Sequence, residues 1–416
     1  MTKNLSEELS WRGFTHQTTF GDPSTLNDKK LTFYWGVDPS SDSMTIGNLA
    51  IAMMVKHLID HGHKAVLLVG GATGIIGDPD GKSKERKLLS PKDLERNKSA
   101  IAKQYKKIFE GQDFEIVDNQ DWFKDINYID FLRDVGKHVP MRQMLGREFV
   151  QSRLGDQGSG ISYAEFSYSL IQGYDFLHLF REKDVTLQVC GSDQWGNSIA
   201  GVELIRRITG KEAHVWSAPL VVNKTTGAKF GKTEDGAVWL DADKTSVFDF
   251  YQFWLNVDDK NVEDYLKIYT LLSKEEIQKA IDEFKQNPGD RKAQKTLAYE
   301  VTKLIHGSVA AQSQKLIAEV LFGKEDALEL GEREYTMLDK QLPTAKVPRN
   351  MTTEDIVGAL VDTGLASSKT EGRRFLQNGA VYINNQKITE NFLFDGVSKK
   401  AIIRRGKNNC AIINMV

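Results

Sequence analysis

The stretch FYWGVDPSSDSMTIGNLA, residues 33–50, decides the fold of this chain. A run typical of a buried strand, LTFYWGV, enters it, and a run typical of a helix, NLAIAMMVKHLIDHG, leaves it. Gly36 and Gly47 allow close backbone approach, and a helix that starts near Gly47 offers free N–H groups and a positive dipole end to a phosphate. The turn is equally compatible with a helix capped by Ser43 or Thr45.

Four polar side chains in the same turn suit a nucleotide. Asp38 and Ser40 can bond a ribose or an amine. The hydroxyl of Thr45 and the amide of Asn48 can each donate a hydrogen bond to a phosphate oxygen as neutral groups. These positions therefore form a candidate ATP site.

Outward from this turn, strand-like and helix-like segments alternate, which predicts an α/β fold with a parallel sheet and crossover helices. Ligands of such sheets bind beyond the carboxyl ends of the strands, where the polar and glycine-rich motifs of this chain fall. The predicted strands are 31–37, 64–69 followed by a glycine-rich loop, and 185–193, and the predicted helices are 47–62, 91–109 and 196–208.

The chain changes character after the alternating region. Five segments after residue 246 have apolar residues at helical spacing, and a charged segment with Pro343 and Pro348 follows them. We expect a parallel-sheet domain over 1–225, a KFGKT loop segment over 226–245, an α-helical domain over 246–325, a linker over 326–350 and a small α+β domain over 351–416.

The composition is that of a soluble globular protein, with 416 residues, 40% hydrophobic residues and a formal net charge of −2. The two cysteines, Cys190 and Cys410, are too few for a disulfide framework, which fits a reducing compartment. The N-terminal segment resembles neither a secretory signal nor a transit peptide, and no apolar run is long enough to span a bilayer. We therefore expect a cytoplasmic protein without membrane contact.

Two motifs place charged groups near the strand ends. In GGATGIIGDPDGKSKERK, residues 70–87, Asp78 can pair with an ammonium, while Lys82 and Arg86 suit a polyanionic leaving group. In AKFGKTEDGAVWL, two lysines and a threonine around a glycine hinge can close over a triphosphate: Lys229, Lys232 and Thr233. A solvated charged loop and a basic hairpin turn are the alternatives.

Two further motifs present polar groups to a small ligand. In SYAEFSYSLIQGYDF, Tyr168, Gln172 and Asp175 share one helix face, which suits a zwitterion with a polar ring substituent. In QVCGSDQWGN, Asp193 and Gln194 follow a strand end and point into its crevice. The alternatives are a partly buried helix with satisfied polar groups and an ordinary turn that Asp193 caps.

The C-terminal module is basic, unlike the chain as a whole. From residue 351 to residue 416 we count nine Lys or Arg and six Asp or Glu, a net charge of +3 (9 − 6). A helix face with Lys369, Arg373 and Arg374 precedes a turn and a strand. This asymmetry indicates an acidic partner such as RNA, with a dimerisation or capping module as the alternative.

In this order and spacing, the motifs YWGVDPSSDS, GGATGIIGDP, EFSYSLIQGYDF, GSDQWGN and KFGKT resemble bacterial-type tyrosyl-tRNA synthetases, which are class I aminoacyl-tRNA synthetases. The resemblance covers essentially the whole chain, including an S-four-like RNA-binding domain at its C-terminus. It implies a Rossmann-like catalytic domain over 1–225 with a dimer-forming insertion, and an α-helical domain over 246–325 that holds the anticodon arm. It also implies tyrosine–tRNA ligase activity, ATP as substrate with Mg²⁺ and no protein-held metal, and a homodimer that binds tRNA(Tyr).

The resemblance also implies roles for individual residues. Tyr34 and Asp175 would bind the phenol hydroxyl of tyrosine, and Asp78, Tyr168 and Gln172 its ammonium, with Gln194 nearby. The ATP-binding residues would be Gly36, Asp38, Ser40, Gly47, Asn48, Gly191, Asp193 and Lys232. The catalytic groups on the pyrophosphate would be Thr45, Asn48, Lys82, Arg86, Lys229, Lys232 and Thr233. The tRNA contacts would be Arg206, Arg207, Lys369, Arg373 and Arg374.

Two departures from the family pattern bear on specificity. Thr-Ile-Gly-Asn at 45–48 replaces the usual His-Ile-Gly-His, and Cys190 stands where a glycine is common. Since Thr-Ile-Gly-Asn resembles the tryptophanyl-tRNA synthetases, tryptophan is the alternative substrate. Against it stand the Tyr34 and Asp175 pair and the C-terminal domain. A non-catalytic RNA-binding homologue is a third reading, against which the retained Lys82, Lys229 and Lys232 argue.

Overall fold

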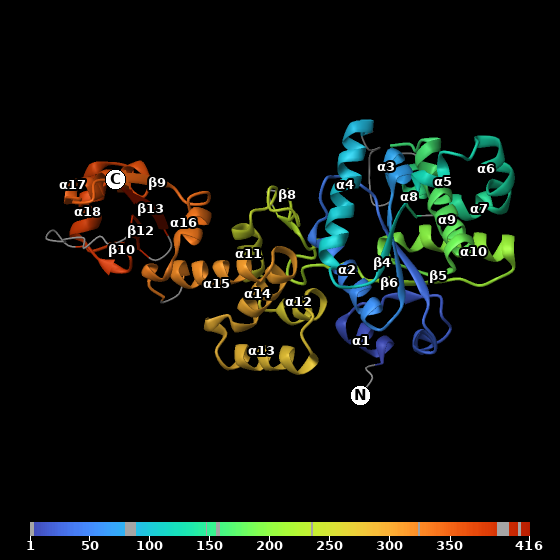
Figure 1. The fold of residues 1–416 in the computed structure, drawn as a ribbon, viewed down its shortest axis with the longest axis horizontal. Coiled ribbons are helices and arrows are strands. Elements are labelled where there is room, and N and C mark those ends of the chain that lie inside the picture. The colour runs from blue at the N-terminus through green and yellow to red at the C-terminus, as the bar shows by residue number, and fades with distance from the viewer. Residues whose placement is uncertain are drawn as a thin grey trace. The chain divides into compact units, whose positions relative to one another are not determined.

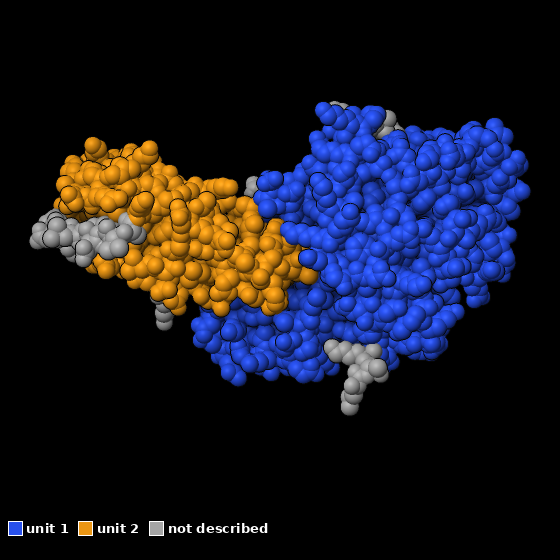
Figure 2. All heavy atoms as spheres, in the orientation of Figure 1, with its two compact units in different colours: residues 1–245, 257–297 blue, residues 246–256, 298–416 orange. Residues whose placement is uncertain are grey.

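The computed structural model describes residues 4–79, 89–146, 148–154, 159–233, 236–322, 325–388, 399–406 and 409–416. The chain divides into two compact units (Figures 1 and 2): residues 1–245 with 257–297, and residues 246–256 with 298–416. Each unit is described by itself. In the described residues, no helix has both the length and the apolar character that a bilayer span requires.

The first unit contains the predicted parallel sheet, in the strand order β1-β6-β5-β2-β3-β4. Strands β2 to β6 are mutually parallel, and β1 runs antiparallel to β6 at one edge. The chain passes from β2 to β3 and β4 on one side, and returns to β5 on the other, so the topological switch point lies between β2 and β5. The strands are β1 Gln17–Thr18, β2 Thr32–Val37, β3 Lys64–Val69, β4 Phe114–Asp118, β5 Val185–Gly191 and β6 His214–Ala218.

Helices cover both faces of this sheet (Figure 1), with α2 (Ile46–Asp60) and α4 (Pro91–Ile108) on one face and α9 (Tyr163–Lys183) and α10 (Trp195–Thr209) on the other. Alternation along β2 decides which side chain faces which helix. Trp35 packs edge-on against Tyr105 of α4, whereas Tyr34 packs 5.2 Å from Phe176 of α9, between ring centroids. Tyr34 and the polar face of α9 therefore lie on the same side of the sheet.

The glycine-rich stretch after β3 is a short helix, α3 (Gly71–Ile76), and the predicted loop is wrong. Side chains at the end of β4 cap its first turn, since Asp118 and Asn119 accept hydrogen bonds from the Gly71 and Ala72 N–H groups at 3.2 and 2.6 Å. A Cβ on Gly70 would lie 2.2 Å from an Asp38 oxygen and one on Gly71 equally close to Asp118. The glycines thus make room for carboxylates of the protein itself.

The remaining elements of the first unit are short or peripheral. Seven of them precede α9 or the KFGKT turn: α1 (Leu5–Arg12), η1 (Pro23–Asn27), α5 (Gln120–Phe123), α6 (Tyr128–Asp134), η2 (Gly136–His138), α7 (Met141–Leu145) and α8 (Glu148–Leu154). The others are η3 (Ser192–Gln194), β7 (Lys232–Thr233), β8 (Gly236–Ala237), α12 (Val262–Tyr269), α13 (Lys274–Gln286), η4 (Pro288–Asp290) and the start of α14 (Lys292–His306).

The second unit consists of helices and a five-stranded sheet in the order β11-β10-β12-β13-β9. Only β9 is parallel to its neighbour, β13. The sheet buries Ile402 and Ile412 against α15 and α16, and Ile403 and Ile413 against α17. The elements are α11 (Val247–Leu255), α15 (Ser308–Phe322), η5 (Ala327–Glu329), α16 (Glu332–Leu338), β9 (Thr344–Val347), α17 (Thr353–Asp362), α18 (Lys369–Gln377), β10 (Val381–Ile383), β11 (Gln386–Lys387), β12 (Lys400–Arg405) and β13 (Asn409–Met415).

Two expectations about the chain after residue 246 need correction. Residues 326–350, predicted as a linker, form η5, α16 and β9, because Leu330, Tyr335 and Leu338 are buried in the core that β12 and β13 share with α15. Helices are present over 246–322 as predicted, but contacts do not group them as one domain. The boundary between the two units falls inside α14, and α11 belongs to the second unit.

Candidate active site

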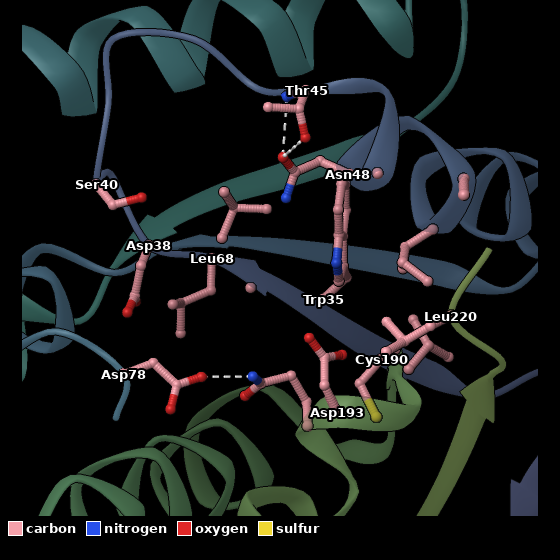
Figure 3. A pocket seen from close by; sticks show the side chains of 18 of the residues that line it. Trp35, Asp38, Ser40, Thr45, Asn48, Leu68, Asp78, Cys190, Asp193 and Leu220 are labelled. Atoms are coloured by element: carbon pink, nitrogen blue, oxygen red, sulfur yellow. Dashed lines mark hydrogen bonds between the residues drawn. The ribbon is translucent and has the colours of Figure 1, made fainter. Parts of the chain in front are cut away.

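A cavity of about 520 Å³ lies at the carboxyl ends of β2 and β5, at the topological switch point. It brings together fifteen of the predicted site residues, from segments far apart in the chain (Figure 3). Its lining includes Tyr34, Gly36, Asp38, Ser40, Thr45, Gly47, Asn48, Asp78, Tyr168, Gln172, Asp175, Gly191, Asp193, Gln194 and Lys229.

Asp38 is a centre of hydrogen bonding in the cavity. It stands directly after β2, and its two carboxylate oxygens accept from the Thr73 hydroxyl at 2.6 Å and the Tyr168 hydroxyl at 2.7 Å. Burial, with the charge of Asp38 second, raises the pKa of the Tyr168 phenol well above its ordinary value. The two bonds connect β2, α3 and α9, and so hold three walls of the cavity together.

Asp175 is a buried carboxylate on α9, with 1% of its surface exposed. It accepts hydrogen bonds from the Asn119 side chain at 3.0 Å and the Trp122 indole N–H at 2.9 Å. Burial raises the pKa of Asp175 well above its ordinary value, while these two donors oppose that shift. Sequence reasoning missed Thr73, Asn119 and Trp122, although the polar run DNQDW directly follows β4 and so stands at a strand end.

The Tyr34 hydroxyl is the other polar group at this end of the cavity. Its residue is 2% exposed, and within the described residues the hydroxyl has no hydrogen-bond partner. Burial, followed by the charge of Asp175, raises the pKa of this phenol well above its ordinary value, so it stays protonated. A buried donor without a partner is costly, and here it lines a cavity that a ligand can fill.

Asp78 and Gln194 are in direct contact at one side of the cavity. The Gln194 amide donates to Asp78, as Figure 3 shows, and accepts from Asn197 of α10 at 3.2 Å. Asp78 lies two residues after α3, and Gln194 is the last residue of η3, which follows β5. Two sequence motifs that lie far apart are therefore joined at one side of the cavity.

Thr45 and Asn48 form a capping box at the start of α2. The Thr45 backbone N–H and hydroxyl both donate to the Asn48 Oδ1, at 3.0 and 3.1 Å. The expectation that both side chains donate to a phosphate is therefore corrected for Thr45, whose hydroxyl proton is engaged. In Figure 3 the amide nitrogen of Asn48 points away from Thr45 and into the cavity, so Thr45 orients the donor and Asn48 supplies it.

The basic groups expected on the pyrophosphate are only partly within the described structure. Lys229 lines the cavity. Lys232 and Thr233 form β7, and their side chains lie outside the described part. Lys82 and Arg86 fall within 80–88, outside the described residues.

The arginines expected on tRNA lie on helix surfaces and are partly paired with glutamates. In the first unit, Arg206 and Arg207 at the end of α10 lie 2.6 and 3.5 Å from Glu203. In the second unit, Arg373 of α18 binds Glu354 of α17 through two hydrogen bonds, at 2.9 and 2.7 Å. Arg374 lies 3.8 Å from Glu371, and Lys369 begins the same helix.

Comparison with known proteins decides the family. Residues 26–323 match the model of the class I tRNA synthetases for tryptophan and tyrosine, and residues 334–413 match that of the tyrosine–tRNA ligase SYY-like C-terminal domain. The chain is similar to a C-terminally truncated mitochondrial tyrosyl-tRNA synthetase from Aspergillus nidulans, with 32% identity, a TM-score of 0.70, and 77% of this chain and 94% of that chain covered. The chain belongs to the tyrosyl-tRNA synthetases.

Further structures resemble this synthetase. A truncated mitochondrial tyrosyl-tRNA synthetase from Coccidioides posadasii is 31% identical over 76% of this chain and 91% of its own, with a TM-score of 0.67. A tryptophanyl-tRNA synthetase from Encephalitozoon cuniculi, at 13% identity over 80% of this chain and 91% of its own and a TM-score of 0.54, shares the fold alone. The activity is therefore that of a tyrosine–tRNA ligase, which uses ATP. The described residues of the synthetase contain no group of three or more His, Cys, Asp or Glu placed to hold a metal ion.

Proposed function

We propose that tyrosine binds with its phenol hydroxyl between Tyr34 and Asp175. The supporting observation is the buried Tyr34 hydroxyl, which has no partner within the described residues and lies in the same cavity as a buried carboxylate. The ligand hydroxyl donates to Asp175 and accepts from Tyr34, so both buried groups become satisfied. Phenylalanine leaves the Tyr34 hydroxyl without a partner and brings no donor to Asp175, and enzymes of this family are an example of such rejection.

The ammonium of tyrosine is held at the opposite end of the cavity by Asp78, Tyr168 and Gln172, with Gln194 beside the carboxylate. This arrangement suits a zwitterion, because the Asp78 carboxylate can pair with the ammonium and the adjacent Gln194 amide can donate to the carboxylate. Tyr168 keeps its phenol proton and donates a hydrogen bond to Asp38. Its oxygen therefore retains lone pairs that can accept from the ammonium.

ATP lies along the turn from Gly36 to Asn48, with Ser40 and Asp38 on that side and Gly191 and Asp193 on the other. The tyrosine carboxylate attacks the α-phosphate in line, which forms tyrosyl-adenylate and releases pyrophosphate. The protein supplies positioning and charge stabilisation and needs no nucleophile of its own. Asn48, the basic residues Lys82, Arg86, Lys229 and Lys232, and the hydroxyl of Thr233 grip the leaving pyrophosphate.

Mg²⁺ enters with ATP, bound to its phosphates. Both oxygens of Asp38 accept hydrogen bonds from side chains of the protein, which leaves the phosphates as the better source of ligands for this cation. Activation that proceeds equally fast after exhaustive chelation of divalent cations would overturn this proposal.

Exchange of pyrophosphate into ATP tests the substrate assignment. Exchange should depend on tyrosine, and tryptophan and phenylalanine should support it only weakly. Exchange driven better by tryptophan would support the alternative substrate, and its absence with every amino acid would support the non-catalytic homologue.

The synthetase forms a homodimer through the insertion between β4 and α9. Within the described residues, six of the fifteen exposed large apolar side chains fall in this segment, and a seventh, Tyr163, begins α9: the six are Tyr128, Ile129, Leu132, Met141, Leu145 and Leu154. Tyr128 and Tyr163 lie together, with their hydroxyls 3.2 Å apart. A cluster of this kind on a monomer is typical of a protein interface.

Ile129→Glu is expected to weaken dimerisation about 100-fold or more, because it buries an unpaired charge in that interface. Sedimentation equilibrium measures the dissociation constant. Leu328→Glu, at a comparably exposed leucine of the second unit, is the matched control and should leave the dimer intact. Equal behaviour of the two variants would contradict this assignment of the interface.

tRNA(Tyr) binds to Arg206 and Arg207 with its acceptor stem, and to an S-four-like domain over 351–416 through Lys369, Arg373 and Arg374. The domain organisation supports this assignment through the net charge of +3 and through the placement of all three basic residues on α18. Arg374→Glu should weaken tRNA binding about tenfold or more while pyrophosphate exchange stays unchanged. Unaltered tRNA binding would remove α18 from the interface.

We propose that the enzyme is of the bacterial type and cytoplasmic, although the two fungal structures are of mitochondrial enzymes. The full set of motifs supports the type, and the two cysteines, too few for a disulfide framework, fit a reducing compartment. Charging of bacterial tRNA(Tyr) tests the type, and fractionation of the source cell tests the location.

A further inference from the structure

The KFGKT turn rests on an aromatic surface of α12. The Phe230 ring stacks on Tyr265, with 4.0 Å between ring centroids and 29° between ring planes, and lies 5.9 Å from Tyr269. Tyr265 and Tyr269 are four residues apart on one face of α12, almost fully buried, and pack edge-on against each other. We call these two tyrosines the aromatic ledge.

Polar contacts fasten the segment before Phe230 to the same helix. The Lys224 backbone N–H donates to the Asn261 side chain at 2.9 Å, and Lys224 forms an ion pair with Asp264 of α12. The Asn223 amide donates to Asp258 at 3.2 Å. The turn is therefore held to α12 and its N-terminal approach on both sides of Lys229.

The other side of the turn presses on the start of α2, where Thr45 and Asn48 lie. Gly231 has φ +89°, and a Cβ built on it would be 2.5 Å from Ile46. Val238 closes this contact, since its N–H donates to the Gly231 carbonyl at 3.0 Å and its carbonyl accepts from the Ile46 N–H at 3.1 Å. The turn is thus wedged between α12 and the N-terminus of α2, with Lys229 facing the cavity.

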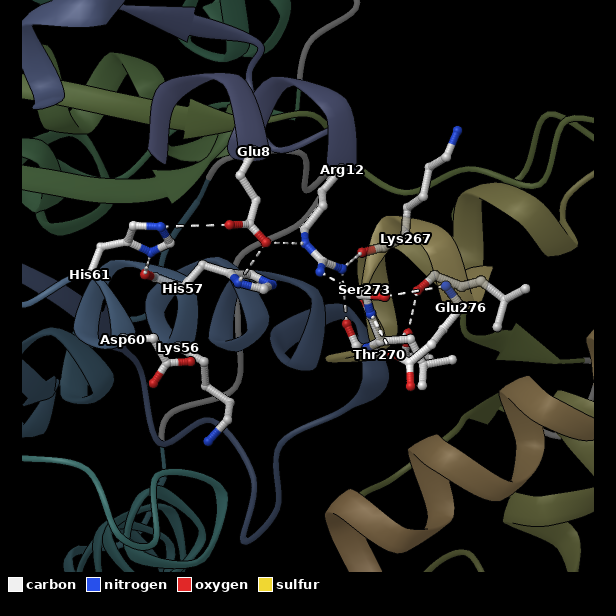
Figure 4. Close-up of polar contacts among 12 residues, drawn as sticks. Glu8, Arg12, Lys56, His57, Asp60, His61, Lys267, Thr270, Ser273 and Glu276 are labelled. Carbon is white, nitrogen blue, oxygen red and sulfur yellow. Dashed lines mark hydrogen bonds and ion pairs between the residues drawn. The ribbon is translucent and has the colours of Figure 1, made fainter. Parts of the chain in front are cut away.

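The far end of α12 is itself clamped by the N-terminal helix α1 (Figure 4). The Arg12 guanidinium, 2% exposed, donates to the carbonyls of Lys267, Thr270 and Leu272 at 3.0, 3.1 and 2.9 Å. Glu8 binds Arg12 at 3.2 Å and also lies 3.7 and 3.6 Å from the rings of His57 and His61, at the end of α2. Helix α1 therefore connects the ends of α2 and α12.

We propose that Phe230, Tyr265 and Arg12 are positioning residues for the activation step. The aromatic ledge fixes the side of the turn from which Lys229 reaches the phosphates, and Arg12 fixes the ledge relative to α2. This inference rests on the proposed role of Lys229 at the pyrophosphate. The stacked ring anchors the turn to α12 beside Lys229, which orients the lysine toward the cavity.

The test compares Phe230→Ala with Tyr265→Ala and Tyr265→Phe in single-turnover formation of tyrosyl-adenylate. Loss of either ring of the stack should lower the rate constant about 10- to 100-fold, while KM for tyrosine stays within about twofold. Tyr265→Phe is the matched control, because it keeps the ring and removes a hydroxyl that has no partner within the described residues. It should retain the wild-type rate.

Active-site titration separates positioning from loss of fold, since it counts the chains able to form adenylate. An alanine variant with a reduced active fraction but an unchanged rate per active chain would contradict the proposal. A double-mutant cycle combines Phe230→Ala with Lys229→Ala. If Phe230 acts through Lys229, the double variant should be at least about tenfold faster than the product of the two single losses predicts.

Different outcomes would contradict the proposed role of Lys229 and the proposed positioning by Phe230. A Lys229→Ala variant as fast as wild type would remove the proposed role of Lys229. A slow Lys229→Ala variant, with Phe230→Ala unaffected or with fully additive losses, would leave that role in place and overturn the positioning inference. Arg12→Lys keeps the charge but cannot bind the three carbonyls in the same geometry. Like Phe230→Ala, it should lower the rate constant of adenylate formation without changing KM for tyrosine.

Discussion

Asp175→Asn is expected to lower kcat/KM for tyrosine activation about 10³-fold, while the much lower value for phenylalanine changes less than about threefold. The tyrosine hydroxyl loses its charged acceptor, and the new amide faces the donors Asn119 and Trp122. Phenylalanine never used that acceptor, so discrimination between the two substrates collapses. Pyrophosphate exchange with each amino acid measures the effect.

The pH dependence adds a second readout for the same residue. Burial raises the pKa of Asp175, so its carboxyl protonates at a higher pH than an exposed aspartate does. Protonation removes the negative charge of the carboxylate that accepts from the tyrosine hydroxyl. The value of kcat/KM for tyrosine should therefore fall as the pH is lowered toward that pKa. The asparagine variant should lack this fall.

The matched control for Asp175→Asn is Asp184→Asn, at the other end of α9. Asp184 caps the helix with φ +53°, a conformation that asparagine adopts readily, and it does not line the cavity. It should keep both activities. A loss with phenylalanine as large as the loss with tyrosine would mean that Asp175 supports the packing of α9 and does not recognise the phenol.

Asn48→Asp is expected to lower the rate constant of adenylate formation about 10³-fold and to leave tyrosine binding unchanged. The two side chains are nearly isosteric, and the retained oxygen still accepts both hydrogen bonds from Thr45. The helix cap therefore persists, while an amide donor is replaced by a negative charge beside the phosphates. Stopped-flow measurement of the single turnover gives the rate constant.

Thr45→Ser and Thr45→Val test whether the Thr45 hydroxyl orients Asn48 for phosphate binding. Serine keeps the hydroxyl that donates to Asn48 and should be close to wild type. Valine removes that donor and should slow adenylate formation about tenfold, since Asn48 is then less well oriented. If Asn48→Asp were as active as wild type, the turn would be a cap alone and the phosphates would be bound elsewhere.

Most of the active site was predictable because its residues stand at strand ends. Asp38 follows β2 and Asp193 follows β5, and parallel strands bring their carboxyl ends to one edge of the sheet, where the cavity lies. The spacing of Tyr168, Gln172 and Asp175 on α9 needed only helical periodicity. Local patterns were enough for these residues.

Partnerships between distant side chains were not predictable. No local pattern links Asn119 and Trp122 to Asp175, and the Thr45 hydroxyl turned out to serve Asn48. The stretch after β3 was predicted as a loop on account of its glycines, and it is helical because Asp118 and Asn119 cap it from β4. Residues 326–350 appeared to be a linker because their charge and prolines masked the buried Tyr335 and Leu338.

Exchange of pyrophosphate into ATP by the wild-type chain, with tyrosine, phenylalanine and tryptophan in parallel, tests the central claim most directly. The claim is that the buried Tyr34 and Asp175 bind the phenol hydroxyl of the substrate tyrosine next to a functional ATP site. It predicts rapid exchange with tyrosine and values of kcat/KM at least about 10⁴-fold lower with phenylalanine and tryptophan. Exchange with tryptophan or phenylalanine at a rate comparable to that with tyrosine, or no exchange with any of them, would contradict it.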